Sequence, residues 1–238
     1  MMSRNFKLYR IGDIHWLKNN YKFDSVANAI DELIVLDVSR KEKNHTLFCE
    51  TLKHLTSHVF IPVSAGGGIV SHAHAEKLFA SGADKLVLNT VLYNQRDFVF
   101  ELIKRYGSQC VVASIDFKNV AGVLRVFVKN GTEMIEDQLV NYIHQLEVCQ
   151  VGEIYLNSID KDGTGQGYDC VALSQILEKR IVPIILAGGA GNFLHLLTGI
   201  RLTSIQAVAI SNLLNFIGDG LSLARKELLK NEVALSDW

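Results

Sequence analysis

Short apolar runs alternate with longer amphipathic runs along the chain. The apolar runs predict strands at residues 33–38, 59–64, 85–89, 111–117, 153–158, 182–187 and 207–211. Between them, apolar residues recur with helical spacing, for example over residues 71–81 and 97–106, which predicts helices. Several strands are apolar nearly throughout, as strands of a parallel sheet are when helices cover both faces. Residues 123–128, followed by Asn130 and Gly131, predict a small hairpin inserted after one strand.

The chain also repeats itself at a constant offset of 121 positions. The matching pairs are Glu32-Leu33 with Glu153-Ile154, Pro62 with Pro183, Gly67-Gly68 with Gly188-Gly189, and residues 87–90 with 208–211. A constant offset indicates duplicated halves, whereas the alternative is the generic period of any β/α array. Two such halves make an eight-stranded (β/α)₈ TIM barrel, whose active site lies at the C-terminal ends of its strands. We expect one such domain over residues 1–238.

The same repeat predicts that the barrel is incomplete at its start. The run at residues 111–117 opens the second half, and the partner of Asp116, 121 positions earlier, would precede Met1. We therefore expect the first strand to be missing from this chain, which would leave two unpaired strand edges. Either the start is misplaced or something else fills the gap.

Two glycine-rich loops lie at equivalent positions of the repeat. Residues 65–68 (AGGG) and 187–191 (AGGAG) each follow a strand and precede a helix. Glycines there let backbone amides approach an anion, although a tight turn without a ligand is the alternative. Asn89, Thr90 and Ser211 end the next strand of each half and supply small polar groups. Two such cradles at one barrel mouth suit a ligand with two phosphates.

Carboxylates follow several of the predicted strands. Asp116 ends the run VVASID, where a charged group is costly unless it is hydrogen-bonded or functional. It is the candidate general acid or base, with a loop-capping aspartate as the alternative. Asp37 ends ELIVLD in the same way. Asp160 and Asp162 lie in SIDKDGTGQG, which we interpret as a mobile substrate loop, although Asp162-Gly163 is also an ordinary turn sequence.

Composition and charge narrow the class of protein. With 48% hydrophobic and 21% charged residues and a net charge of −1, the chain fits a folded globule and lacks the positive field of a nucleic-acid-binding protein. No apolar run approaches the roughly 20 residues needed to span a bilayer, and the N-terminus lacks the apolar core of a signal peptide. We expect a soluble, cytoplasmic protein that binds neither nucleic acid nor membrane.

The cysteines and histidines indicate no metal site. The four cysteines are far apart and form no C-x-x-C pair of the kind that zinc or redox motifs use. His72 and His74 are two positions apart, which places them on different faces of a helix. Because a metal site needs converging ligands, we expect surface histidines, no metal and no cofactor.

The motifs as a set closely resemble the cyclase subunit of imidazole glycerol phosphate synthase. They are DELIVLDV, IPVSAGGGI, GADKLVLNT, YGSQCVVASIDFK, GEIYLNSIDKDGTGQGYD and PIILAGGAG, in that order. The resemblance implies a barrel that takes ammonia from a glutaminase partner in histidine biosynthesis. The reaction it implies converts a bisphosphorylated ribulosyl-formimino aminoimidazole carboxamide nucleotide into imidazole glycerol phosphate and aminoimidazole carboxamide ribonucleotide.

The resemblance also implies roles for matching residues. Asp116 matches the general acid/base of the family. One phosphate site matches Gly67, Gly68, Asn89 and Thr90, and the other matches Gly188, Gly189 and Ser211, with Asp162 and Gly163 in the substrate loop. Asp37 and Ser158 match neighbours in the mouth. The charged residues Glu32, Lys85 and Glu153 match three of the four that gate ammonia, and Asp84 and Gln109 match the face that meets the glutaminase.

The departures from the family leave alternatives open. The second catalytic aspartate and the fourth gate residue of the family, an arginine, lie on the strand that this chain lacks, so we expect weak or no cyclisation. A second group of cyclase-like barrels works with a glutaminase and an amidotransferase to place an acetamidino group on a sugar, and Asn157 and the divergent N-terminal region favour it. A third hypothesis is a non-catalytic barrel that binds a glutaminase and a phosphorylated ligand.

Overall fold

The computed structural model describes residues 2–4, 6–9, 16, 29–40, 42–57, 59–174, 176–178, 180–211 and 220–236. The chain divides into two compact units, and each is described by itself. The first unit consists of residues 13–114 and 149–152, and the second consists of residues 1–12, 115–148 and 153–238. The prediction of a single domain over residues 1–238 stays a prediction.

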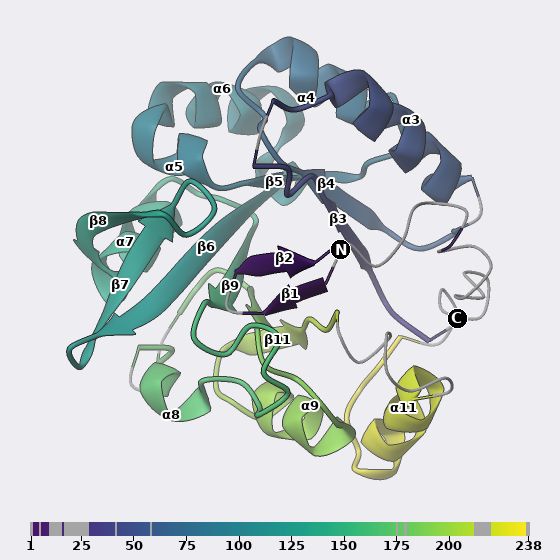
Figure 1. Cartoon of the computed structure of the whole chain (residues 1–238), viewed down its shortest axis with the longest axis vertical. Helices are drawn as coiled ribbons and strands as arrows, with labels where there is room; N and C mark the ends of the chain where they lie inside the picture. The colour runs from purple at the N-terminus through teal and green to yellow at the C-terminus, as the bar shows by residue number, and fades with distance from the viewer. Residues whose placement is uncertain are drawn as a thin grey trace. The chain divides into compact units, whose positions relative to one another are not determined.

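The first unit is a parallel sheet with a helix after each strand. Its strands are β3 (Leu33–Leu36), β4 (Val63–Gly66), β5 (Lys85–Leu88) and the beginning of β6 (Val111–Val120), and each pairs in parallel with the next. The helices are α3 (His45–Thr56), α4 (His72–Phe79), α5 (Thr90–Asn94) and α6 (Arg96–Tyr106), with a 3₁₀ turn, η1 (Ser108–Cys110), before β6. Figure 1 shows α3, α4 and α6 on one side of β3, β4 and β5.

The second unit continues the same pattern. Its parallel strands follow the order β6, β9 (Glu153–Ser158), β10 (Ile184–Ala187) and β11 (Ile205–Val208). The helices are α7 (Leu139–Val148), α8 (Cys170–Leu173), α9 (Phe193–Ile200) and α11 (Gly220–Lys230). After Asp116, β6 runs on into an antiparallel hairpin with β7 (Val123–Val128), which in turn pairs with β8 (Glu133–Gln138). The hairpin predicted from the sequence is confirmed.

The half-repeat is visible in the elements themselves. A shift of 121 positions carries β4 onto β10 and α4 onto α9, residue for residue. The helix caps correspond as well, because the side chain of Ser71 accepts from the amide of His74 and that of Asn192 accepts from the amide of His195. Such caps satisfy amides that a helix leaves open at its first turn. The strand–helix alternation in both units confirms the predicted α/β class of the (β/α)₈ type.

Two predicted strands begin later than the hydrophobic pattern suggested. Residues 59–64 and 182–187 read as strands, whereas β4 begins at Val63 and β10 at Ile184. Each run contains a proline, Pro62 or Pro183, which has no amide to donate to a neighbouring strand. The carbonyl oxygen of each proline still accepts a backbone hydrogen bond. Leu33 N donates to Pro62 O, and Ile154 N donates to Pro183 O. In both halves of the repeat, the proline thus determines the residue at which strand pairing begins.

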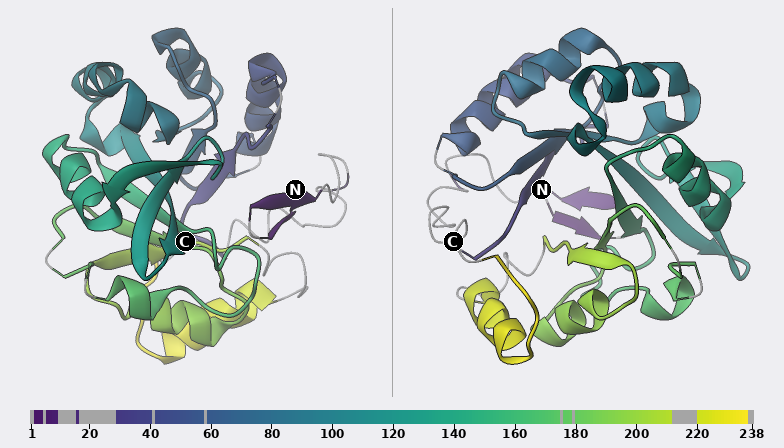
Figure 2. Two further views of the ribbon diagram at one scale, coloured as in Figure 1. Left: turned by 60° about the vertical axis from the view of Figure 1, so that its left-hand side comes forward. Right: turned by 180° about the vertical axis from the view of Figure 1, so that it is seen from behind.

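A short hairpin lies near the amino end of the chain. It pairs β1 (Met2–Arg4) with β2 (Lys7–Tyr9) in antiparallel fashion, and Figure 2 shows it as a ribbon separate from the strands of the second unit. The residues that the structure describes contain seven parallel strands, with β3 and β11 at the ends of the strand order. An eighth parallel strand is not among them, and most of residues 10–28, which include the divergent N-terminal region, lie outside them.

Candidate functional site

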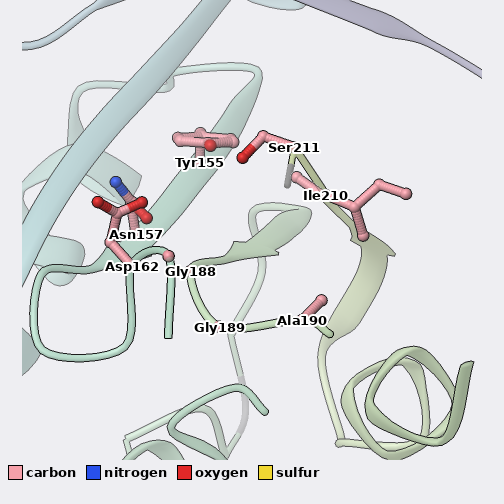
Figure 3. Close-up of a pocket in the computed structure, with 10 residues that line it drawn as sticks. Tyr155, Asn157, Asp162, Gly188, Gly189, Ala190, Ile210 and Ser211 are labelled. Carbon is pink, nitrogen blue, oxygen red and sulfur yellow. The ribbon is translucent and has the colours of Figure 1, made fainter. Parts of the chain in front are cut away.

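A pocket in the second unit lies at the carboxyl ends of β9, β10 and β11 (Figure 3). Its lining residues are Tyr155, Asn157, Asp162, Gly163, Gly188, Gly189, Ala190, Ala209, Ile210 and Ser211. Tyr155 and Asn157 come from β9, the glycines follow β10, and Ser211 follows β11. The structure thus brings together Gly188, Gly189 and Ser211, predicted to form one phosphate site, with Asp162 and Gly163 of the predicted substrate loop.

The two glycines that form the floor of this pocket cannot be replaced without strain. Gly188 has φ +86° and Gly189 has φ +113°, a region that side-chain-bearing residues rarely adopt. A Cβ on Gly188 would lie 2.8 Å from the carbonyl oxygen of Ser158, and one on Gly189 would collide with the carbonyl oxygen of Gly167. Close packing against neighbouring backbone therefore requires glycine at both positions, and both residues also line the pocket.

Asp116 is connected to this pocket through Asn157. The Asp116 side chain lies on the buried part of β6 and is 8% exposed. Asn157 Nδ2 donates to Asp116 Oδ1 at 3.3 Å. A buried carboxylate is tolerated when it is hydrogen-bonded, and this bond fixes the candidate acid/base group relative to the pocket wall.

Tyr155 is a pocket residue that sequence reasoning missed. Burial raises the pKa of its phenol, and the neighbouring carboxylates of Asp116 and Asp162 raise it further. The phenol therefore stays protonated and is a hydrogen-bond donor for an anion. The alternation of side chains along a strand could have identified Tyr155. Residues 153, 155 and 157 lie on one face of β9, and the buried Ile154 and Leu156 lie on the other.

Asp162 is held by the amino-terminal hairpin. Ser3 Oγ donates to Asp162 Oδ2, and the amide of Phe6 donates to the same oxygen at 3.0 Å. On the loop side, Asp162 N donates to Ser158 O at 2.9 Å. The Ser158 side chain itself is 1% exposed and does not line the pocket. The carboxylate that we expected to contact substrate is thus engaged by residues outside the predicted site.

The first unit contains the other glycine cradle. Gly67 and Gly68 have φ +115° and +78°, and a Cβ on Gly67 would collide with the carbonyl oxygen of Asp37. At the end of β5, Asn89 Nδ2 donates to Ser114 O at 3.0 Å, and Thr90 Oγ1 donates to the Asn89 amide oxygen at 3.3 Å. Asp37, Gly67 and Gly68 are therefore brought together beside β5, whose last residue is followed by Asn89 and by Thr90, the first residue of α5.

Lys43 and His45, which the sequence analysis did not name, lie beside this first cradle, and His74 stacks on His45. Lys43 Nζ donates to Asp37 O at 2.7 Å and lies 3.6 Å from Asp37 Oδ2. The rings of His45 and His74 stack with their centroids 4.0 Å apart. Both histidines are partly exposed, as is His72. The contact between His45 and His74 could not be predicted from their spacing in the sequence, because it joins α3 to α4.

The residues expected at the ammonia gate and partner face lie at the amino ends of the strands. Lys85 Nζ donates to Glu32 Oε1 at 2.7 Å in the first unit, whereas Glu153 opens β9 in the second. Asp84 is exposed, and its Oδ2 accepts from the Val63 amide at 2.8 Å. Gln109 is also exposed, after α6. The structure pairs two of the three gate residues within one unit.

The described part of the chain was searched for metal-binding side-chain groups and for membrane-spanning helices. It holds no group of three or more histidine, cysteine, aspartate or glutamate side chains placed to bind a metal ion. Nor does any helix within those same ranges have the length and apolar character needed to cross a membrane.

Comparisons with known proteins give a consistent result. The family model described as "Histidine biosynthesis protein" matches residues 13–216. A Parasynechococcus marenigrum protein named "Putative imidazole glycerol phosphate synthase subunit hisF2" is 44% identical over all of this chain and 88% of its own length. A Pseudomonas aeruginosa protein of the same name is 36% identical over 79% of this chain and 76% of its own length. "Imidazole glycerol phosphate synthase subunit HisF" of Chloroherpeton thalassium is 35% identical over 86% of this chain and 82% of its own length.

Proposed function

The chain belongs to the histidine biosynthesis protein family, and from this premise we propose that it is the cyclase subunit of imidazole glycerol phosphate synthase. In this role it is an ammonia-dependent lyase. It converts the bisphosphorylated ribulosyl-formimino aminoimidazole carboxamide nucleotide into imidazole glycerol phosphate and aminoimidazole carboxamide ribonucleotide. The names of the relatives, at 35% to 44% identity, support this activity.

The observation that carries the proposal is the pocket of the second unit with Asp116 beside it. Gly188 and Gly189 leave the backbone bare at the end of β10, while Ser211 and the protonated phenol of Tyr155 add hydroxyl donors. Together they suit a phosphate group. Asn157 reaches from the pocket wall to the Asp116 carboxylate. A phosphate bound here would place the rest of the substrate near one acid/base group.

The proposed division of labour follows from these positions. The glycine cradles and their hydroxyl groups bind the phosphates and so hold the reacting centre in place. Asp116 moves protons as general acid or base during ring closure, and Asn157 holds its carboxylate. Asp162 exchanges its bond to the hairpin for one to the substrate.

The partner that we propose is a glutaminase that supplies ammonia. The ion pair of Lys85 and Glu32 and the position of Glu153 support delivery at the amino ends of the strands. Asp84 and Gln109, exposed in the same region of the first unit, are the proposed contact residues.

A second candidate is a cyclase-like barrel that passes ammonia to a sugar amidotransferase for acetamidino-group synthesis. Asn157 favours this second candidate, because its side-chain amide donates a hydrogen bond to Asp116, the candidate acid/base group. Two of the relatives also carry the hisF2 name rather than HisF. In this reading the phosphate pocket and ammonia handling are retained, and turnover depends on the separate amidotransferase.

The test is turnover of the linear nucleotide by the purified chain with ammonium as the nitrogen source. Appearance of both products, even at the low rate expected from the sequence, supports the cyclase, and Asp116→Asn is expected to lower that rate by about 10²- to 10⁴-fold, the usual contribution of a general acid or base. Asp97→Asn, an exposed carboxylate on α6, is the matched control. No product from ammonium, or from glutamine with the glutaminase, would overturn the proposal. Product formed only with a sugar amidotransferase would select the second candidate.

A further inference from the structure

Two tyrosines of the second unit lie at the pocket, and their hydroxyl groups are used differently. The Tyr168 hydroxyl donates to Ala209 O at 3.0 Å, which ties the end of the substrate loop to the end of β11. Tyr155 lines the pocket, but its hydroxyl makes no hydrogen bond to any residue in the described part of the chain. Most polar groups inside proteins have such a partner, so each exception needs an explanation.

Tyr155 lies deeper in the second unit than the glycine turn does. In the pairing of β9 with β10 it is opposite Ile185, two residues before Ala187, where β10 ends. Two residues of a strand span about 7 Å. Asn157 follows Tyr155 by two residues on the same face of β9, and its Nδ2 donates to Asp116 Oδ1 at 3.3 Å. The unused hydroxyl therefore shares a strand face with the residue that holds the candidate acid/base group.

The surroundings of Tyr155 keep the proton on its hydroxyl. Burial raises the pKa of the phenol, and the negative charges of Asp116 and Asp162 raise it further. The phenol therefore stays neutral in the neutral pH range, where it can donate a hydrogen bond without losing its proton. In the view of Figure 3 the Ser211 hydroxyl points toward the Tyr155 ring from the end of β11, so this side of the pocket carries two hydroxyl groups.

The proposed reaction creates negative charge on an oxygen atom. When ammonia adds to the keto group of the ribulosyl chain, the nitrogen lone pair forms a bond to the carbonyl carbon. The π electrons of the C=O bond move to the oxygen, which becomes an oxyanion, and the nitrogen becomes an ammonium group. Asp116 takes a proton from that nitrogen and returns it to the oxygen, which gives a neutral amino alcohol. A neutral donor fixed at the oxygen lowers the barrier to this step.

We propose that Tyr155 is a catalytic residue whose hydroxyl donates a hydrogen bond to the keto oxygen of the substrate while ammonia adds to the carbonyl carbon. The inference rests on the proposed function, and it assigns one of the pocket's hydroxyl donors to one substrate atom. A phosphate held at the glycine turn would leave the adjoining part of the substrate to extend toward the deeper level of Tyr155 and Asp116. A phenol that keeps its proton is suited to this work, because it stabilises the oxyanion without being consumed.

The test compares Tyr155→Phe with the parent protein, using the linear nucleotide and ammonium. We expect kcat to fall by about 10²-fold or more, as when one oxyanion donor is removed from other enzymes. KM for the nucleotide should stay close to that of the parent, because the hydrogen bond strengthens only as charge develops. The denaturation midpoint at neutral pH should not fall, since the hydroxyl has no partner among the described residues to lose.

Three further variants separate catalysis from binding and from folding. Tyr168→Phe loses the bond to Ala209 O and should lower the denaturation midpoint, unlike Tyr155→Phe. Ser211→Ala removes a hydroxyl group from the same pocket and should raise KM with little change in kcat, because a phosphate is bound equally before and during the reaction. Tyr93→Phe, on the exposed part of α5, should change none of these quantities.

The possible results distinguish the inference from the proposed function. If Tyr155→Phe raises KM and leaves kcat unchanged, the hydroxyl binds phosphate alone, so the inference fails and the proposed function stands. A fall in kcat accompanied by a lower denaturation midpoint would assign Tyr155 to the fold and would also overturn the inference. If the parent protein forms no product from ammonium, or from glutamine with the glutaminase, the proposed function and the inference fail together.

Discussion

At the scale of single residues, Gly188 is constrained both by its backbone conformation and by the atoms packed against it, and experiment can separate the two effects. Its φ of +86° is nearly that of Gly122, at +85° in the turn between β6 and β7. A Cβ on Gly122 meets nothing within 4 Å, whereas one on Gly188 meets the Ser158 carbonyl and the Asn157 amide oxygen. Gly122 is therefore a matched control for backbone strain without crowding.

We expect Gly122→Ala to lower the free energy of unfolding by about 1 kcal/mol, the cost of a left-handed alanine. Gly188→Ala should lower it by about 1–3 kcal/mol more, because the crowding adds to the strain. Denaturant unfolding of both variants measures the difference. Equal losses would mean that the loop after β10 relaxes around the new methyl group, and that the close packing against β9 is not essential.

Tyr155 and Tyr168 should make the stability of the second unit depend on pH in the alkaline range. Burial raises the pKa of Tyr155, as it does for Tyr168, whose hydroxyl donates to Ala209 O at 3.0 Å. In the unfolded chain both ionise near about pH 10. Their protonated form thus stabilises the folded state below that pH, and this contribution is lost as the pH rises toward the folded-state pKa values.

Stability of the protein to denaturant should therefore fall as the pH is raised above about 10. Tyr155→Phe and Tyr168→Phe should each make that decline shallower, because phenylalanine cannot ionise. Tyr93→Phe, on the exposed part of α5, is the control and should leave the slope unchanged. A decline that is equally steep in all three variants would show that other groups cause it.

At the scale of secondary structure elements, α4 and α9 provide a direct comparison between the two halves. Each begins after a glycine cradle and is capped by one side chain, Ser71 or Asn192. We expect Ser71→Ala and Asn192→Ala each to cost about 1 kcal/mol of unfolding free energy. Thr198→Ala, on α9 with its hydroxyl bonded to Leu194 O, lies away from the cap and should cost less. Thermal or denaturant unfolding distinguishes these outcomes, and a cap variant as stable as the control would contradict the prediction.

The elements also show which parts of the structure could be predicted from sequence. The apolar runs predicted β4 and β10, and the offset of 121 related the two strands, because the prolines and glycines at their ends act through the backbone next to them in the chain. The contact between Asn157 and Asp116 could not be found this way, since it joins β9 to β6. The same holds for the His45–His74 stack. Position on a strand predicts which residues reach the mouth, but not which side chains meet there.

At the scale of the whole molecule, the two halves keep one plan and differ in what surrounds each cradle. In the first unit Lys43, His45 and His74 adjoin Gly68, and in the second Asp162 and Tyr155 adjoin Gly188. The same glycine turn therefore lies beside basic side chains in one half of the repeat, and in the other half it lines a pocket with a carboxylate and a phenol.

The repeat also carries a pair of exposed apolar residues at the amino ends of the strands. Phe60 precedes β4 and is 94% exposed, and Ile181, its partner in the repeat, precedes β10 and is 88% exposed. Large apolar side chains on a surface are candidates for a protein interface. Since ammonia is proposed to enter at these strand ends, we expect both residues to contact the glutaminase.

Phe60→Ser and Ile181→Ser should each weaken glutaminase binding by about tenfold or more, because an apolar anchor in an interface contributes about 1.5–3 kcal/mol. Glutamine-dependent turnover should fall accordingly at limiting glutaminase, while ammonium-dependent turnover stays at the level of the parent protein. Val171→Ser, on α8 and 91% exposed, removes a similar side chain from another position and should change neither rate. If the two variants lost ammonium-dependent turnover as well, the residues would serve the barrel itself, and the glutaminase would have to dock elsewhere.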